Sequence, residues 1–206
     1  MYLVKAPSLL KPLARDLLWR MDDSKKDVYL TFDDGPTPGV TEKVLDTLKK
    51  HNVPATFFCL GKNVAAYPEI FARIKEEGHA VGNHSYDHVD GWKTSLITYA
   101  KNVLKANEVI GSNLFRPPYG RITPQQVSML KKRFRIVMWH VISADFDQSI
   151  SGEKCVQNIV ENTDNGSIIV FHDSLKAADN CLYALEPSLA FFQELGFTCK
   201  TLASIQ

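Results

Sequence analysis

His84 and His88 are the first candidates for metal ligands in this sequence. On a helical turn, a spacing of four residues points both imidazoles the same way, as two ligands of one ion must point. Asp33 or Asp34 could supply a third ligand, giving a set of two histidines and one aspartate with open positions for water and substrate. Each feature alone has an ordinary explanation, a chance pair on an exposed helix or a simple Asp-Asp-Gly-Pro turn. Together they predict a catalytic metal site.

The two adjacent carboxylates also suit a division of tasks. Successive residues at the end of a strand point to different sides, so one carboxylate can bind metal while the other takes a proton from water at the ion. Arg116 could keep the second carboxylate ionised and oriented through a bidentate contact. The alternative for residues 116–120 is a rigid loop with a surface arginine.

His172 is a candidate for a general acid. It follows the apolar residues 168–171, and hydrolysis of an amide needs a proton donor for the leaving nitrogen. Asp145 could pair with His172. The alternatives are a hydrogen-bonded structural histidine and, for Asp145 and Asp147, solvated loop charges.

These polar residues all follow segments that are typical of strands. Apolar strand-like segments lie at residues 28–32, 55–60, 80–82, 114–115, 136–139, 168–171 and 198–201. Helix-like segments lie between them. One begins with Thr41 as cap and has Val44, Leu45 and Leu48 on one face, and another begins with Thr123 as cap and Pro124 at its first position. The others span residues 68–77, 96–110, 153–161 and 182–195.

Six or seven strand–helix units indicate a parallel sheet with helices outside it, either an open doubly wound sheet or a barrel. No Gly-x-Gly-x-x-Gly follows the first strand, which argues against a dinucleotide-binding sheet. A full barrel of eight units takes about 250 residues, so we expect a distorted (β/α) barrel, TIM-like, with seven units. The ends of its parallel strands would share one face, where the polar residues converge.

Composition narrows the class of protein. With 206 residues, 45% of them hydrophobic and 23% charged, we expect one globular domain. The formal net charge of +1 gives no reason to expect nucleic acid or an anionic membrane as partner, and no apolar run approaches the roughly 20 residues of a transmembrane helix. The four cysteines show no pairing pattern and are expected to be buried free thiols.

The first twenty residues bear on the compartment. Lys5, Lys11, Arg15 and Asp16 interrupt their short apolar clusters, and no small-residue cleavage site follows. As written, the chain therefore predicts a cytoplasmic protein without an export signal, whereas removal of a leader would fit the cell envelope.

The ordered motifs of the chain resemble those of the polysaccharide deacetylases of carbohydrate esterase family 4, the NodB-homology domain. The segments that carry the resemblance are Thr31-Phe32-Asp33-Asp34-Gly35-Pro36, His84-Ser85-Tyr86-Asp87-His88, Arg116-Pro117-Pro118-Tyr119-Gly120, Asp145 and Ile169-Val170-Phe171-His172. TFDDGP followed by HSxxH and RPPYG is a highly specific order. We therefore expect a single domain of this family over residues 1–206, with its motif-bearing core at about 28–203.

The resemblance implies a distorted (β/α) barrel that binds one divalent metal ion through Asp34, His84 and His88. Two imidazoles and one carboxylate suit zinc, cobalt or nickel, and zinc is the first expectation. The further roles that the resemblance implies are Asp33 as catalytic base, Arg116 as its tether, the Tyr119 backbone N–H as oxyanion donor, His172 as catalytic acid and Asp145 as the partner of His172. Phe146 departs from the family, in which a tryptophan usually follows the fourth-motif aspartate.

The sequence thus predicts a hydrolase that removes N-acetyl groups, or as second choice O-acetyl groups, from a glycan and releases acetate. A catalytically weak glycan-binding module that keeps its metal and an amidase for small linear or cyclic amides are the alternatives. Tyr86, Trp92 and Tyr119 could stack on sugar rings at the mouth of the site, although Trp92 fits the core equally well. Chitin, peptidoglycan and acetylated xylan all remain open as substrates, and the oligomeric state is not indicated.

Overall fold

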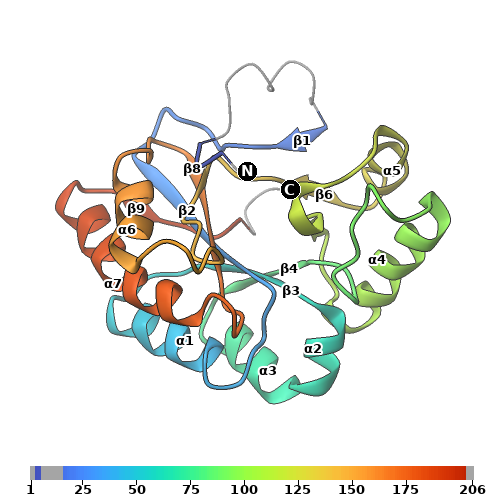
Figure 1. Cartoon of the computed structure of the whole chain (residues 1–206), viewed down its shortest axis with the longest axis horizontal. Coiled ribbons are helices and arrows are strands. Elements are labelled where there is room, and N and C mark those ends of the chain that lie inside the picture. Colours follow the sequence, from blue (N-terminus) through green and yellow to red (C-terminus); the bar gives the residue numbers. More distant parts are fainter. Residues whose placement is uncertain (1–2, 6–15, 203–206) are drawn as a thin grey trace.

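Strands and helices alternate along the chain, as the sequence predicts, in a computed structural model that describes residues 3–5 and 16–202. These residues form one sheet of nine strands with seven α-helices arranged around its outer side (Figure 1). The strands are β1 (Leu17–Leu18), β2 (Asp27–Asp33), β3 (Thr56–Cys59), β4 (Ala80–Asn83), β5 (Leu114–Phe115), β6 (Arg135–Val137), β7 (Val141–Ile142), β8 (Ser167–His172) and β9 (Thr198–Cys199). The helices are α1 (Thr41–Lys50), α2 (Gly61–Ala66), α3 (Pro68–Glu76), α4 (Leu96–Ile110), α5 (Pro124–Leu130), α6 (Gly152–Val160) and α7 (Ala178–Glu194).

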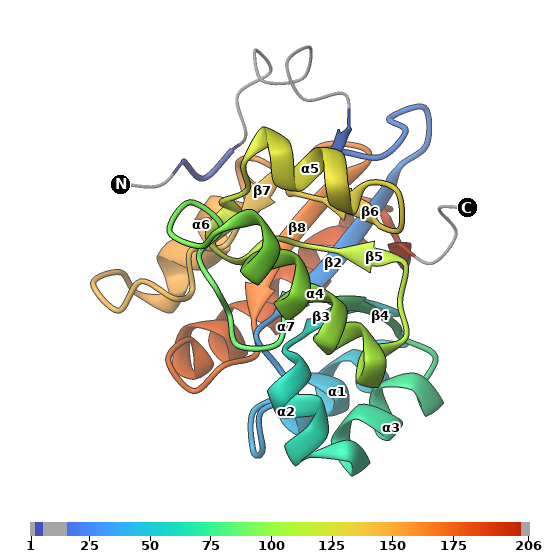
Figure 2. The same ribbon diagram turned by 90° about the vertical axis from the view of Figure 1, so that its right-hand side faces the viewer.

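The sheet is parallel and strongly curled. Its strand order is β1-β6-β5-β4-β3-β2-β8-β7, with β9 paired to the start of β2. Within the described residues no ladder joins β1 to β7, but single antiparallel bridges join Lys5 to Val141 and Arg20 to Ser167. Figure 2 shows the outer layer from the side, with α4 across β4 and β5 and α5 beside β6. The expected distorted barrel is confirmed, and the open doubly wound sheet is not observed.

Local sequence explains most of the element boundaries. Helix α5 begins at Pro124 behind a complete capping box, in which Thr123 and Gln126 each bond the other's backbone N–H, as the Thr-Pro signal indicates. Thr41 differs from its prediction: it is the first residue of α1 rather than its cap, which is Val40. The sequence pattern also does not indicate the short elements β1, α2 and β7.

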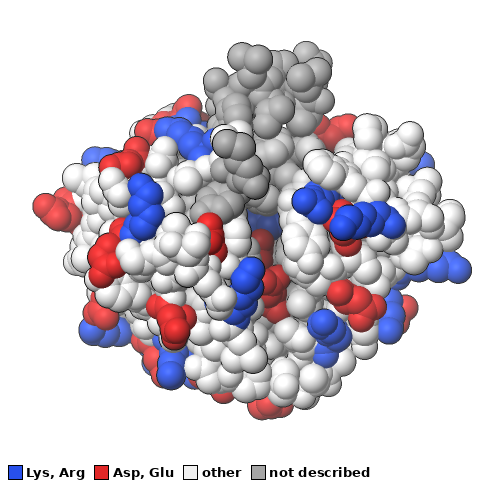
Figure 3. All heavy atoms as spheres, viewed as in Figure 1, with Lys and Arg blue, Asp and Glu red and all other residues white. Residues whose placement is uncertain are grey.

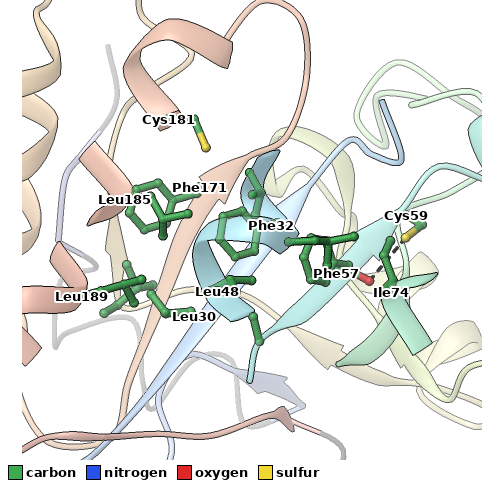
Figure 4. Packing of buried hydrophobic residues seen from close by; sticks show 14 of the residues in the cluster. Leu30, Phe32, Leu48, Phe57, Cys59, Ile74, Phe171, Cys181, Leu185 and Leu189 are labelled. Carbon is green, nitrogen blue, oxygen red and sulfur yellow. Dashed lines mark hydrogen bonds between the residues drawn. The ribbon is translucent and has the colours of Figure 1, made fainter. Parts of the chain in front are cut away.

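The core lies between the central strands and the helices that cover them (Figure 4). Phe32 of β2 stacks on Phe57 of β3 at 5.0 Å between ring centroids and on Phe171 of β8 at 5.6 Å. Leu48 of α1 and Leu185 of α7 belong to the same cluster. Because side chains alternate along a strand, Thr31 and Asp33 of β2 point away from this cluster toward the inside of the curled sheet. Packing of Phe32 therefore fixes where Asp33 emerges.

Two further expectations can be compared with the structure. All four cysteines are free, with Cys59, Cys155 and Cys181 buried and Cys199 half-buried, which agrees with the prediction of free thiols. Among the described residues, none of the helices has the length and apolarity needed to cross a membrane. Most of the N-terminal segment from which the compartment was predicted, residues 6–15, lies outside the described residues.

Candidate active site

A cleft of about 940 Å³ opens where the strands end. Its lining includes Asp33, Asp34, His84, His88 and His172, which come from three strands and the loops after them. Figure 3 shows a hollow near the middle of one face, with acidic and basic side chains inside it. The structure thus brings together residues that lie up to 139 positions apart in the sequence, from Asp33 to His172.

Asp34, His84 and His88 form a cluster suited to a metal ion. One ligand atom from each residue lies within 4.8 Å of the others. His84 Nε2 is 3.6 Å and His88 Nε2 is 3.1 Å from Asp34 Oδ1, and this buried oxygen accepts no hydrogen bond from a described residue. A carboxylate oxygen left without a donor and faced by two imidazole nitrogens fits a divalent cation, so the donor set agrees with the one predicted.

The two histidines converge through a loop and not through a helix. His84 directly follows β4, and the chain reaches His88 with left-handed backbone conformations at Ser85 (φ 66°) and at His88 itself (φ 60°). The prediction of a helical turn is therefore wrong, although the predicted convergence of the imidazoles is observed. Their ring centroids are 5.2 Å apart.

A hydrogen bond orients His84 toward the cluster. Its Nδ1 lies 2.8 Å from the Arg116 carbonyl oxygen, which can only accept, so Nδ1 carries the hydrogen and Nε2 keeps its lone pair. Burial lowers the pKa of His84 to about 4, and the neighbouring His88 and Arg116 charges act in the same direction. His84 is thus a neutral imidazole with a free Nε2, the form in which histidine binds metal.

Asp33 is held by the fully buried Arg116. Arg116 Nη1 donates to Asp33 Oδ1 at 2.6 Å and to Thr31 Oγ1 at 2.7 Å, while Nη2 donates to the Met138 carbonyl at 2.9 Å. The guanidinium also lies 4.1 Å from the centroid of the Phe58 ring. The predicted bidentate contact with Asp33 is not observed: Nη1 alone bonds Asp33, Nη1 and Nη2 also bond Thr31 and Met138, and Nε has no hydrogen-bond partner among the described residues. The single contact leaves Asp33 fixed at the cleft wall.

Asp145 contacts His172 at two points. Asp145 Oδ2 accepts from the His172 backbone N–H, and Oδ1 contacts the ring nitrogen Nδ1 of His172, each at 2.7 Å. Burial alone would lower the pKa of His172, but the charge and hydrogen bond of Asp145, with smaller effects of Asp34 and Asp33, raise it to about 9. His172 is therefore protonated at neutral pH.

Phe146 occupies the place where the family usually has tryptophan. Its ring meets the His172 ring edge to face, with centroids 5.2 Å apart, and it lines the cleft. The apolar wall beside the imidazole is thus retained with a smaller ring.

Tyr119 lies at the turn after β5. Its backbone is left-handed (φ 59°), and its ring packs against His88 at 4.5 Å between centroids while 60% of the residue stays exposed. Gly120 follows with φ 65°, and a Cβ there would lie 2.5 Å from the Trp139 ring. This turn carries the backbone N–H predicted to donate to an oxyanion.

Sequence reasoning missed Asp173 as part of the site. Asp173 is fully buried, accepts from the Gly35 N–H at 3.0 Å and from the Thr41 hydroxyl at 2.6 Å, and donates its own N–H to the Asp33 carbonyl. A Cβ on Gly35 would lie 2.0 Å from Asp173 Oδ2, so the turn after Asp34 closes on this carboxyl only as glycine. Burial raises the pKa of Asp173 to about 7. The available signal was an acidic residue directly after an apolar strand and His172.

Of the three aromatic residues expected at the mouth, Tyr119 lines the cleft, whereas Tyr86 and Trp92 do not. Tyr86 packs against the core, with Lys105 Nζ 3.5 Å from its ring centroid, and does not line the cleft. Trp92, for which a core position was equally possible, is 67% exposed.

Comparison with known proteins agrees with this geometry. Residues 20–133 match the family model described as polysaccharide deacetylase. A peptidoglycan-N-acetylglucosamine deacetylase of Bacillus cereus is 39% identical over 73% of this chain and 57% of its own length. An uncharacterized 30.6 kDa protein of Geobacillus stearothermophilus is 34% identical over 88% of this chain and 71% of its own. The chain thus spans little more than half of the first of these relatives.

Solved structures show the same fold. A crystal structure of a peptidoglycan N-acetylglucosamine deacetylase superposes with a TM-score of 0.89 at 33% identity, covering 97% of this chain and 96% of that one. The peptidoglycan deacetylase PdaC from Bacillus subtilis superposes with a TM-score of 0.78 at 31% identity, covering 89% of this chain and 91% of that one. The chain belongs to the polysaccharide deacetylase family, carbohydrate esterase family 4, as its motifs indicate.

Proposed function

We propose that this protein is a metal-dependent hydrolase that removes acetyl groups from an N-acetylated glycan and releases acetate. The observation that carries the proposal is the presence of two carboxylate–cation pairs, Asp33 with Arg116 and Asp145 with His172, at the cleft that holds Asp34, His84 and His88. A base, an acid and a metal-ligand set at one cleft are the parts that amide hydrolysis requires.

Each residue has a distinct task in this proposal. Asp34, His84 and His88 hold the ion, which when bound supplies a Lewis acid for the acetyl carbonyl and lowers the pKa of water. Asp33, fixed by Arg116, accepts the proton of the attacking water. The Tyr119 N–H donates to the carbonyl oxygen as negative charge develops on it. His172 then protonates the departing nitrogen while Asp145 keeps its ring in place.

The state of His172 favours an N-acetyl substrate over an O-acetyl substrate. An amine leaves as a neutral molecule only after its nitrogen is protonated, and a pKa of about 9 keeps His172 charged at neutral pH. An ester needs this proton less. We therefore place N-acetyl groups first.

The relatives favour peptidoglycan as the glycan. The Bacillus cereus relative is named a peptidoglycan-N-acetylglucosamine deacetylase and a Bacillus subtilis relative a peptidoglycan-N-acetylmuramic acid deacetylase. A chitooligosaccharide deacetylase of Azorhizobium caulinodans is also 34% identical over 75% of this chain. We propose N-acetylglucosamine residues as the acetylated sugars and residues 1–206 as a single catalytic domain.

Acetate release tests the proposal. The purified protein, stripped with a chelator and reloaded with zinc, cobalt or nickel, is incubated with peptidoglycan, N-acetylglucosamine oligomers and acetylated xylan. We expect acetate from the first two substrates, only after metal is restored. Release from small amides but not from glycans would support the amidase alternative instead, and glycan binding without any acetate would support a binding module.

The metal site has its own test within this proposal. The double variant His84→Ala with His88→Ala should lose bound metal and activity together, because only Asp34 of the proposed ligands remains. Elemental analysis of the parent should give near one ion per chain. A double variant that binds as much metal as the parent would refute the assignment of the ligands.

A further inference from the structure

Three planar side chains lead from a proposed metal ligand to the surface of the protein. The Tyr119 ring packs against His88, the Arg121 guanidinium lies 5.5 Å from the Tyr119 ring centroid, and the same guanidinium lies 5.1 Å from the centroid of Trp92. Tyr119 and Arg121 line the cleft, whereas Trp92 lies beyond its lining residues. The series is therefore a continuation of the site toward solvent.

This series is built into well-braced loops. Arg121 Nη1 donates to Asp90 Oδ2 at 2.6 Å, and the other oxygen of Asp90 accepts from the Trp92 backbone N–H at 3.0 Å. The buried Gln126 side chain donates to the Gly91 carbonyl at 2.9 Å. Asp90 thus connects the loop that carries Trp92 to the side chain of Arg121. These hydrogen bonds hold the loop in place, so the exposed Trp92 ring is carried on a fixed backbone.

The exposed Trp92 ring places apolar surface in water, which is unfavourable unless a ligand covers it. Trp92 is 67% and Tyr119 60% exposed, although indole and phenol rings usually bury most of their surface. Exposed aromatic groups next to a cleft are typical of ligand-binding surfaces. A sugar ring presents C–H groups on its face and hydroxyls on its edge, which match an aromatic face and the N–H donors of a guanidinium.

We propose that Tyr119, Arg121 and Trp92 form a platform that binds the sugar residues next to the one that is deacetylated. This inference rests on the proposed function for its choice of glycan. It commits the protein to an oligosaccharide or polysaccharide substrate, because a monosaccharide in the cleft would leave Trp92 without contact. The affinity for glycans must then rise with the length of the sugar chain.

Binding measurements separate this inference from catalysis. Dissociation constants are measured by calorimetry for N-acetylglucosamine oligomers, from the monosaccharide to the pentasaccharide, on an Asp33→Asn background in which acetate release is checked to be absent. Trp92→Ala should weaken binding of the pentasaccharide about tenfold and leave the monosaccharide unchanged. Trp92→Phe should recover much of the loss because it restores an aromatic face.

Ile97→Ala provides the matched control. Ile97 is 58% exposed at the start of α4, close to Trp92 in the sequence but outside the lining of the cleft, so this variant should bind as the parent does. Equal pentasaccharide binding by Trp92→Ala and Ile97→Ala would overturn the platform. A tryptophan fluorescence change that Trp92→Phe abolishes, and that phosphatidylcholine vesicles but not oligosaccharides produce, would also overturn it, in favour of a lipid surface.

The two proposals fail in different ways. Acetate release from the pentasaccharide by the parent protein tests the proposed function alone. Length-dependent binding that needs Trp92, without acetate release, would refute the proposed function and leave the platform in place. Acetate release with equal rates and affinities in Trp92→Ala would do the reverse.

Discussion

The Asp33–Arg116 and Asp145–His172 pairs both join a carboxylate to a cationic side chain, but opposite members face the cleft. In the first pair the Arg116 side chain is fully buried and Asp33, 5% exposed, lines the cleft. In the second pair the Asp145 side chain is fully buried and His172, 15% exposed, lines the cleft. The buried member orients its partner, and the member at the cleft is the one that can exchange a proton.

This difference shows how one kind of ion pair can serve as base or acid. An arginine cannot give up its proton in a protein, so Arg116 holds Asp33 without competing for the proton that Asp33 is proposed to accept. A carboxylate beside an imidazole favours the imidazolium, so Asp145 favours the form of His172 that carries the proton it is proposed to donate. The choice of the buried partner therefore determines the direction of proton transfer.

The largest expected effect comes from Asp33→Asn. The amide keeps the shape of the side chain and its contact with Arg116 but cannot accept a proton, so kcat should fall about a thousandfold. Acetate release measures kcat, and elemental analysis should show nearly unchanged metal content. Equal loss of metal in Asp33→Asn and Asp34→Asn would blur the distinction between base and ligand.

Removal of the buried cation should have the next largest effect, this time on stability. Arg116→Ala leaves the buried Asp33 carboxylate without its charged partner, which should lower the free energy of unfolding by about 3 kcal/mol. Urea unfolding measures the change. The double variant Arg116→Met with Asp33→Asn should recover part of the loss because no charge is then left buried. If it is no more stable than Arg116→Ala, packing and not charge explains the effect.

Asp145→Asn tests the Asp145–His172 pair through the pH dependence of the reaction rate. The acid must be protonated, so activity should fall as pH rises through the pKa of His172, about 9 in the parent. Loss of the Asp145 charge lowers that pKa, and the alkaline limb of the pH–rate profile should move down by about one to two pH units. Metal content should not change. An alkaline limb that stays in place would mean that Asp145 does not tune His172, or that the limb reports another group.

The smallest effect is expected from Asp173→Asn, which tests the hydrogen bonds that link the end of β8, where His172 lies, to the turn after Asp34. Asp173 follows His172 and bonds Gly35 in the turn after Asp34. The asparagine can still accept from Gly35, but its amide nitrogen cannot accept from the Thr41 hydroxyl, at a cost of about 1 kcal/mol in stability. We expect kcat to fall a few fold with KM unchanged. A kcat loss as large as that of Asp33→Asn would instead indicate a direct part in the chemistry.

Sequence reasoning predicted the regular elements well where the pattern is local. The periodicity of residues 96–110 gave the bounds of α4, and Thr123-Pro124 gave the start of α5. Helix α2 and strand β7 are only 6 and 2 residues long, too short to show a period. The hydroxyl of Thr41 predicts a cap, whereas in the structure it donates to Asp173, 132 positions away.

The candidate site shows the same limit. Residue types and motif order identified the residues that the structure brings to the cleft. The path of the chain between His84 and His88 could not be predicted, because it depends on left-handed residues such as Ser85 that have no reliable sequence signal. The position of Trp92 depends on its own loop being held by Arg121, which bonds Asp90, and by Gln126 of α5, which bonds Gly91, and a pattern along the chain does not contain these contacts.

Strand β2 gives the proposed base and a proposed ligand an unusual setting. It pairs with β3, β8 and β9 and is buried along its whole length, and it ends at Asp33, just before Asp34. Backbone amides in such a strand exchange with solvent only when most of the fold opens. The proposed base is therefore carried by one of the last segments to unfold, and heating should leave Asp33 in place up to the global unfolding transition.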